Sequence, residues 1–332
     1  MIMTDSKPPA ISTVFTQLMG CDYPFIAAPM FLVSNEELVV STSEAGGIGG
    51  TPSLNWRSVE QFDAALGAIS SRTSKPYAVN LIVNKTSLRM EQDLDVIVKH
   101  KVPLVITSLG NPQIVIDKVH AYGGKVFCDV VDLKYALKVQ EQGADGVVAV
   151  SAGAGGHAGP ISPLVLLPYL KQHLKIPVIA AGGISNGKQI LAALVLGADG
   201  VQIGTRFIAS NEAHASKEYK EAILNSAPED IVMTRRISGT PAAVINTPYI
   251  QKIGLDIHPV EKFLRSHPLT MKYAKLMRTI LGTRSLEAAA DKTTWKTVWS
   301  AGQGVGLIED IKPAADIMKQ LAREYWEVRN AL

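Results

Sequence analysis

The chain of 332 residues has little cysteine and no long apolar run. Its two cysteines, Cys21 and Cys128, are far apart and do not form a C-x-x-C pair, so neither a disulfide framework nor a cysteine-rich zinc site is expected. No apolar stretch reaches the roughly 20 residues that a membrane span needs. The N-terminal segment carries Asp5, Lys7 and two prolines without an apolar region, so no signal peptide is expected. A cytoplasmic location is the simplest expectation.

The chain also lacks an excess of charge of one sign. Its formal net charge is +3, and its lysines and arginines form no run or stripe, so a nucleic-acid partner is not expected. With 47% hydrophobic residues, the chain can bury a large core. Its length fits one barrel-sized domain with an insertion, or two domains.

Short apolar segments alternate regularly with helical patterns through the first two thirds of the chain. A capping serine, Ser34, is expected at the start of the first helix of this series. The predicted strands are 25–30, 48–51, 77–81, 103–107, 125–128, 146–150, 177–181 and 200–204. The predicted helices between them are 35–45, 56–71, 90–100, 113–122, 133–142, 163–174 and 187–196.

This alternation predicts a parallel sheet with right-handed crossovers. Eight units that end near residue 210 fit a (β/α)8 TIM barrel, which we assign to residues 1–210. The alternative is an open doubly wound sheet. It would need a G-x-G-x-x-G turn after the first strand, where the chain has Ala28-Pro29-Met30-Phe31.

The pattern changes after residue 210. Residues 211–294 are interpreted as a mostly helical insertion that caps the C-terminal mouth of the barrel, and 295–332 as a return to the barrel. The return contains a second glycine loop, 302–306, and a last amphipathic helix, 313–328. An independent helical domain is the alternative. The helical patterns in the insertion are 211–226, 259–267, 271–281 and 285–291, whereas 231–249 shows no clean period.

A histidine follows the most glycine-rich strand end. The apolar run from Val147 to Val150 leads into Gly153-Ala154-Gly155-Gly156, and His157 follows directly. Loops at the C-terminal ends of barrel strands carry the chemistry in enzymes of this architecture. Histidine, with an unperturbed pKa of about 6.5, can take up or hold a proton at neutral pH. His157 is therefore the candidate catalytic residue; the alternative is a solvated histidine on a plain loop.

Two further glycine sites follow the seventh and eighth strands. These are Gly182-Gly183, next to Ala181, and Gly204-Thr205. Loops at these positions of a TIM barrel often bind a phosphate through backbone N–H groups. A Cβ atom at these positions would keep the phosphate away from the N–H groups. The two sites together predict a phosphate-bearing cofactor; tight turns for close packing are the alternative. A flavin mononucleotide (FMN) would place its ring across the mouth, near polar strand ends such as Asn80, Ser108 and Asp129.

Seven segments, in order and at suitable spacings, resemble one family. They are 28–30 (Ala-Pro-Met), 44–47 (Glu-Ala-Gly-Gly), 79–81 (Val-Asn-Leu), 154–159 (Ala-Gly-Gly-His-Ala-Gly), 179–183 (Ile-Ala-Ala-Gly-Gly), 196–207 (Leu-Gly-Ala-Asp-Gly-Val-Gln-Ile-Gly-Thr-Arg-Phe) and 299–308 (Trp-Ser-Ala-Gly-Gln-Gly-Val-Gly-Leu-Ile). In them the chain resembles the nitronate monooxygenases, formerly called 2-nitropropane dioxygenases. That family is related to FMN-dependent enoyl-acyl-carrier-protein reductases.

The resemblance implies an FMN-binding barrel in which His157 acts as a base or as a hydrogen-bond donor to an alkyl nitronate that is oxidised with molecular oxygen. It also implies a set of cofactor contacts: Ala28, Pro29, Met30, Asn80, Asp129, Gly155, Gly156, Ala181, Gly182, Gly183, Gly204, Thr205 and Gln303. No metal is implied, and a homodimer is possible.

Two residues depart from the family pattern. Ala154 stands where many relatives have glutamate, and Asp129 stands where some have a lysine that could stabilise negative charge on the flavin. Two other functions therefore stay open. One is an FMN-dependent reductase that uses NAD(P)H, with a quinone or an enoyl thioester as acceptor; the other is a binding module without catalysis.

Overall fold

The computed structural model describes residues 7–84, 87–236, 240–256 and 298–332. Eight parallel strands form a closed barrel in the order β1-β2-β3-β4-β5-β6-β8-β9. Pairing of β1 with β9, from Phe25 with Val201 to Ala27 with Ile203, closes the barrel. The strands are β1 Phe25–Ala27, β2 Ile48–Pro52, β3 Tyr77–Ile82, β4 Leu104–Ser108, β5 Lys125–Val130, β6 Gly146–Val150, β8 Val178–Ala181 and β9 Gly200–Ile203. The predicted TIM barrel and its eight strands are confirmed.

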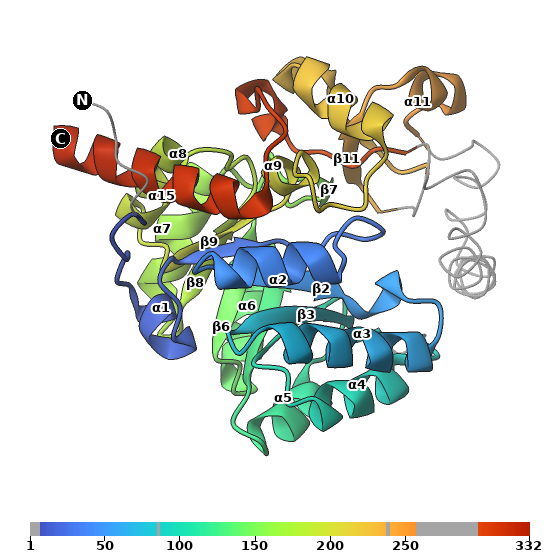
Figure 1. Cartoon of the computed structure of the whole chain (residues 1–332), viewed down its shortest axis with the longest axis vertical. Helices are drawn as coiled ribbons and strands as arrows, with labels where there is room; N and C mark the ends of the chain where they lie inside the picture. Colours follow the sequence, from blue (N-terminus) through green and yellow to red (C-terminus); the bar gives the residue numbers. More distant parts are fainter. Residues whose placement is uncertain (1–6, 85–86, 237–239, 257–297) are drawn as a thin grey trace.

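Helices on the outside connect successive strands (Figure 1). They are α2 Glu36–Glu44, α3 Val59–Arg72, α4 Met90–Lys99, α5 Gln113–His120, α6 Leu133–Glu141, α7 Pro163–His173 and α8 Gly187–Val195, with the short η1 Ser53–Asn55 and α9 Thr205–Ile208. The predicted cap Ser34 is wrong, because the side chain of Asn35 accepts the hydrogen bond from Leu38 N. Ser34 instead holds the loop after β1, as described below.

One helix, at the N-terminal end of the barrel, was not predicted from the sequence. Helix α1, Val14–Met19, precedes β1, and its Phe15 and Met19 pack into the apolar interior with residues of the strands. The rings of Phe15 and Phe127 lie 5.7 Å apart in an edge arrangement. Helix α1 thus packs against the N-terminal end of the barrel, opposite the C-terminal mouth.

The last helix, α15 Ala314–Ala331, packs between α8 and α2 on the barrel wall. The contact with α8 is close: a Cβ on Gly187 would lie 2.2 Å from the backbone N of Tyr325. The C-terminal segment thus supplies the helix that follows β9 in the ring around the barrel. None of the described helices combines the length and the apolar character needed to cross a membrane.

The described part of residues 211–256 contains helices and a small sheet next to the mouth (Figure 1). Its elements are α10 Lys217–Asn225, η2 Pro228–Asp230, β10 Ile231–Thr234, β11 Ala242–Ile245 and α11 Pro248–Ile253. Strands β10 and β11 form an antiparallel pair, in the stretch where the sequence analysis found no period, and β7 Gly156–His157 joins them. The helices predicted at 259–267, 271–281 and 285–291 lie outside the described residues.

Candidate active site at the barrel mouth

The barrel interior changes from apolar to polar towards the mouth. Its buried cluster includes Ala78, Ile106 and Phe127 on three neighbouring strands. Since side chains alternate along a strand, the next inward positions are two residues further on. On β3, β4, β5 and β9, the inward residues nearest the mouth are Asn80, Ser108, Asp129 and Gln202.

Three of these side chains form one hydrogen-bonded chain. The amide of Asn80 donates from Nδ2 to the carbonyl of Ile106 at 3.1 Å and to Ser108 Oγ at 2.7 Å. The Ser108 hydroxyl donates to Asp129 Oδ2 at 2.5 Å. The structure therefore brings together Asn80 and Asp129, two predicted cofactor residues, through Ser108.

Two buried oxygens at this rim, Asp129 Oδ1 and Gln202 Oε1, accept no hydrogen bond from the described residues. Burial raises the pKa of Asp129 to about 6, although the hydrogen bond from Ser108 opposes this shift. Gln202 was not predicted as a site residue. Its signal was the one that marked Asn80, a polar residue inside an apolar strand.

His157 is held by the added sheet. Gly156 and His157 form β7, which pairs with Ala243 and Ala242 of β11, and Gly156 has a φ of 66° that favours glycine. The His157 side chain is exposed to solvent, although neighbouring protein atoms displace part of its hydration. This partial burial disfavours the imidazolium and lowers the pKa of His157 below its usual value, so the ring is neutral at neutral pH.

Backbone packs against backbone where the loop after β6 meets the C-terminal glycine loop. A Cβ on Gly155 would lie 2.8 Å from Gly302 N, and a Cβ on Gly302 would lie 2.4 Å from Gly153 O. Gln303 N donates to Gly153 O at 3.0 Å, whereas the Gln303 side chain is exposed. Only glycine permits this approach, so Gly155 lies against Gly302, and Gln303 lies against Gly153, across more than a hundred residues of sequence.

The loop after β8 lies next to these two glycine loops, and the three together form a glycine-lined surface. Gly182 and Gly183 have φ values of 119° and 70°, and a Cβ on Gly183 would meet no atom within 4 Å. The carbonyl of Ala181 accepts the Ser151 hydroxyl at 2.8 Å, and Gln189 Nε2 donates to Gly183 O at 2.6 Å. Gln189 was not predicted; it fixes the turn and leaves the face of Gly183 open.

Thr205 has a second role that the sequence did not reveal. Its Oγ1 accepts a hydrogen bond from Gly302 N at 3.0 Å. The next residue, Arg206, is buried and donates to the backbone O and the carboxylate of Asp310, at 2.8 and 2.5 Å. The loop after β9 is therefore joined to the C-terminal return at two points.

The loop after β1 lies against the loop after β9. A Cβ on Gly204 would lie 3.6 Å from Ala28 Cβ and 3.7 Å from the sulfur of Met30, and the next residue to Ala28, Pro29, lies against Gly50. Ser34 Oγ donates to Ala28 O at 3.2 Å and accepts from Met30 N at 3.0 Å. The predicted residues of β1 and β9 thus form one edge of the mouth.

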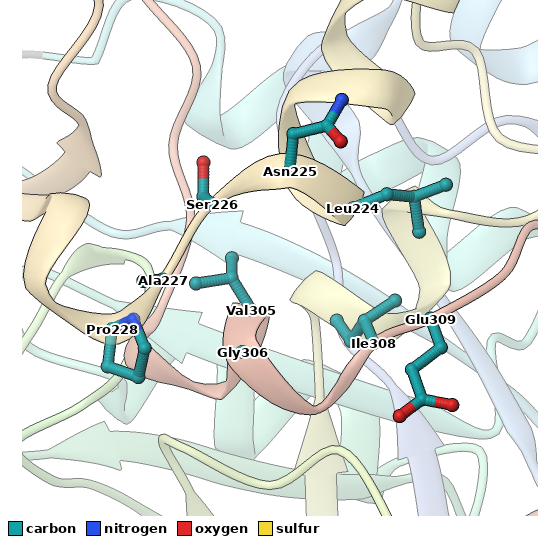
Figure 2. Close-up of a pocket in the computed structure, with 9 residues that line it drawn as sticks. All are labelled: Leu224, Asn225, Ser226, Ala227, Pro228, Val305, Gly306, Ile308 and Glu309. Atoms are coloured by element: carbon teal, nitrogen blue, oxygen red, sulfur yellow. The ribbon is translucent and has the colours of Figure 1, made fainter.

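A separate cavity of about 540 Å³ lies on the outer side of η3 Gln303–Leu307. Figure 2 shows Val305 and Ile308 of the return segment facing residues at the end of α10. The lining residues are Leu224, Asn225, Ser226, Ala227, Pro228, Val305, Gly306, Ile308 and Glu309. None of the predicted site residues lines it, so this cavity is distinct from the mouth.

Comparison with known proteins agrees with this geometry. The model of the family "Nitronate monooxygenase" matches residues 85–324. The chain belongs to the nitronate monooxygenase family. A probable nitronate monooxygenase from Staphylococcus saprophyticus is 29% identical over 96% of this chain and 99% of its own length. The family consists of flavin-dependent oxidoreductases, and this chain is one of them.

Solved structures of relatives have the same fold. FabK from Thermotoga maritima has a TM-score of 0.81 and 32% identity, covering 97% of this chain and 98% of FabK. A nitroalkane oxidase from Streptomyces ansochromogenes has a TM-score of 0.79 and 25% identity, covering 96% and 99%. A carboxyl-CoA dehydrogenase from Rhodococcus jostii is 28% identical over 93% of this chain and 94% of its own length. The chain is thus similar both to an oxidase and to a dehydrogenase.

The residues at the mouth fit a flavin. The open faces of Gly183 and Gly156, where a Cβ would meet no atom, offer backbone amides to a phosphate or to a flat ring. The buried oxygens of Asp129 and Gln202 need partners that the described protein does not supply. The polar edge of a flavin ring carries both donors and acceptors of hydrogen bonds, so it can satisfy such groups.

Proposed function

We propose that this protein oxidises alkyl nitronates with molecular oxygen and that FMN is its cofactor. The observation that carries the proposal is the position of His157 on β7, next to the glycine surface of a family member. The probable nitronate monooxygenases and the nitroalkane oxidase among its relatives support the same substrate class. When bound, FMN supplies the redox chemistry, and the protein supplies position and electrostatics.

The proposed roles of the residues follow from their environments. Gly182, Gly183 and Gly204 would present amides to the phosphate, with Thr205 holding the adjoining loop. Asn80 and Asp129 would contact the polar edge of the ring, and Ala28, Pro29 and Met30 its other side. Gly155, Gly156, Ala181 and Gln303 would line the space between them.

Neutral His157 can accept a hydrogen bond or a proton from the carbon next to a nitro group. Its lowered pKa keeps it in the basic form at neutral pH, which a general base requires. In the alternative role, the N–H of the neutral ring donates a hydrogen bond to a nitronate oxygen. Pairing of β7 with β11 fixes the backbone, so either role uses a positioned ring.

A second candidate is an FMN-dependent reductase that uses NAD(P)H and passes electrons to a quinone or an enoyl thioester. The likeness to FabK, and to a dehydrogenase that acts on a CoA ester, supports it. The two candidates differ in which molecule donates electrons to the flavin, so the donor decides between them.

The test is anaerobic mixing of the purified holoprotein with each donor, followed by visible absorption. We expect propyl-2-nitronate to bleach the visible absorption of the flavin after anaerobic mixing, and the absorption to return when oxygen is admitted. Bleaching by NADPH or NADH, without bleaching by the nitronate, would reject the oxygenase and favour the reductase. Mass spectrometry of the released yellow compound tests FMN directly, and FAD would contradict that part of the proposal.

A further inference from the structure

Asp129 lies at the mouth of the barrel. One of its carboxyl oxygens accepts a hydrogen bond, and the other has no hydrogen-bond partner among the described residues. The carbonyl of Ile106 can only accept hydrogen bonds, so the Asn80 amide must turn its NH2 group towards Ile106 and Ser108. Ser108 has one hydroxyl hydrogen, which goes to Asp129 Oδ2. The chain of donors therefore ends at Oδ2, and Oδ1 stays buried with no hydrogen bond from the described residues.

No positive charge compensates this carboxyl group in the described structure. No lysine, arginine or histidine of the described residues forms an ion pair with Asp129 within 4 Å. The neighbouring strands bring Ser108 from β4 and Val148 from β6, and the titratable groups nearby are Cys128 on β5 and Tyr135 on α6. Burial raises the pKa of the Cys128 thiol to about 12 and the pKa of Tyr135 above its usual value, so both stay neutral.

Burying an ionised carboxylate costs free energy when no positive charge is near and one of its two oxygens lacks a hydrogen bond. A proton on Oδ1 removes the charge and converts an unsatisfied acceptor into a donor. The loop of His157 also belongs to the mouth, but its imidazole is neutral at neutral pH and offers no compensating charge.

We propose that Asp129 is protonated when the cofactor is bound and that it donates the Oδ1 proton to an acceptor atom on the polar edge of the flavin ring. This inference rests on the proposed FMN site. Through Ser108 the same carboxyl group also orients Asn80, so the two predicted ring contacts form one unit.

The raised pKa of Asp129, about 6, is consistent with this assignment. A ring that covers the carboxyl group removes more water and raises the pKa further. Binding then takes up a proton whenever the free protein has lost it, so the affinity for FMN decreases as pH rises above 6. If the ionised form instead accepted a hydrogen bond from the ring, binding would lower the pKa and the affinity would increase with pH.

The experiment is a titration of the full-length apoprotein with FMN, followed by quenching of flavin fluorescence, between pH 5.5 and 8.5. The Asp129→Asn variant is the key comparison, because its amide accepts from Ser108 and donates with its NH2 group at every pH. The phosphate of free FMN titrates near pH 6, as phosphate monoesters do. That titration is common to both proteins, so the ratio of their dissociation constants isolates Asp129.

We expect the ratio of the wild-type Kd to the Asp129→Asn Kd to rise with pH above 6, by up to about tenfold per pH unit. The matched control is Asp132→Asn, which changes an exposed helix-capping carboxylate to another good cap and should follow the wild type. A C=O stretch of a protonated carboxyl group in the infrared spectrum of the holoprotein, lost in Asp129→Asn, is a second readout.

A ratio that is flat, or that falls as pH rises, would overturn the assignment of Asp129 even though FMN binds. Absence of FMN binding at any pH in the wild type would be a different result. It would reject the proposed flavin site itself, and with it the inference that depends on that site.

Discussion

The two sides of the barrel mouth differ in what they present: glycine backbone on one side and polar side chains on the other. On one side, the loops after β6 and β8 and the return loop meet through glycine backbone, with a Cβ on Gly302 only 2.4 Å from Gly153 O. On the other side, β3, β4 and β5 contribute side chains, and Asn80, Ser108 and Asp129 form a hydrogen-bonded chain. The first of these, the glycine side, offers backbone N–H groups on closely packed loops, and His157 is the titratable group of its described residues.

The glycine side therefore contributes mainly to binding the cofactor, and the side-chain side can also adjust the charge and hydrogen bonds around it. Backbone amides that bind a phosphate keep the same charge and donor role at every pH, because they do not titrate. Side chains such as Asp129 change charge and hydrogen-bonding role with their surroundings. We therefore expect changes on the glycine side to weaken flavin binding most. Changes on the side-chain side should alter flavin affinity less strongly and, at Asp129, its dependence on pH, and changes at His157 should alter turnover.

The largest effect is expected from His157→Ala, which tests whether binding and chemistry are separate. Removal of a general base costs about a hundredfold to ten-thousandfold in rate. Since His157 is exposed at the mouth and its backbone pairing stays, the variant should keep its flavin. The measurement is kcat with a neutral nitroalkane, whose carbon His157 would deprotonate, alongside flavin content from absorption. Normal turnover would show that the histidine has no catalytic role.

The next effect is expected from Gly302→Ala on the glycine side. The added methyl group would collide with backbone that cannot rotate away, which costs about 1–3 kcal/mol and shifts the loops apart. We expect roughly ten- to hundredfold weaker FMN binding, measured by fluorescence quenching. Gly67→Ala is the control, because Gly67, like Gly302, has no positive φ and its Cβ would lie 3.8 Å from the nearest atom, an ordinary contact. Equal flavin affinity in both variants would contradict the three-loop contact.

A smaller effect is expected from Ser108→Ala, which cuts the link between Asn80 and Asp129. Each protein hydrogen bond contributes about 0.5–1.5 kcal/mol net, so flavin affinity should fall by roughly threefold to tenfold. Dissociation constants at a fixed pH measure this change. Thr107→Ser, on the same strand but outside the chain of bonds to Asp129, serves as control. Unchanged affinity in Ser108→Ala would mean that the network does not position the ring contacts.

The smallest effect is expected from pH in the neutral range. The pKa of His157 lies below its usual value, so the basic form predominates above about pH 6.5. If His157 is the base, kcat for a neutral nitroalkane should change less than about twofold from pH 7 to 8 and decrease as pH falls through the lowered pKa. A rate that increases on acidification would instead support the protonated ring as the active form.

Much of the barrel could be predicted because its signals are local. Each apolar strand is three to six residues of the right composition, and each helix after it has a clear apolar face, so all eight strands were found within a few residues. Helix α1 was missed because its six residues are too few to show a period. Strands β10 and β11 are as short as β8 and β9, but they were missed because no regular alternation with helical patterns surrounds them.

The residues at the candidate site were identified one by one, but not their contacts. Glycine pairs, His157 and Asn80 are visible as exceptions in otherwise apolar segments. Gln202 and Gln189 were missed although Gln202 breaks an apolar strand in the same way. The hydrogen bond from Gly302 to Thr205 joins residues 97 positions apart, and no local pattern predicts it.

The sequence by itself therefore determined the barrel, the glycine positions and the family, since these depend on side-chain periodicity and on motifs within short segments. Only the tertiary structure decided that β11 pairs with β7 to hold His157, that Ser108 joins Asn80 to Asp129, and that Asp129 Oδ1 is buried without a partner. The physical reason is that hydrogen bonding and desolvation depend on which distant segments meet in space.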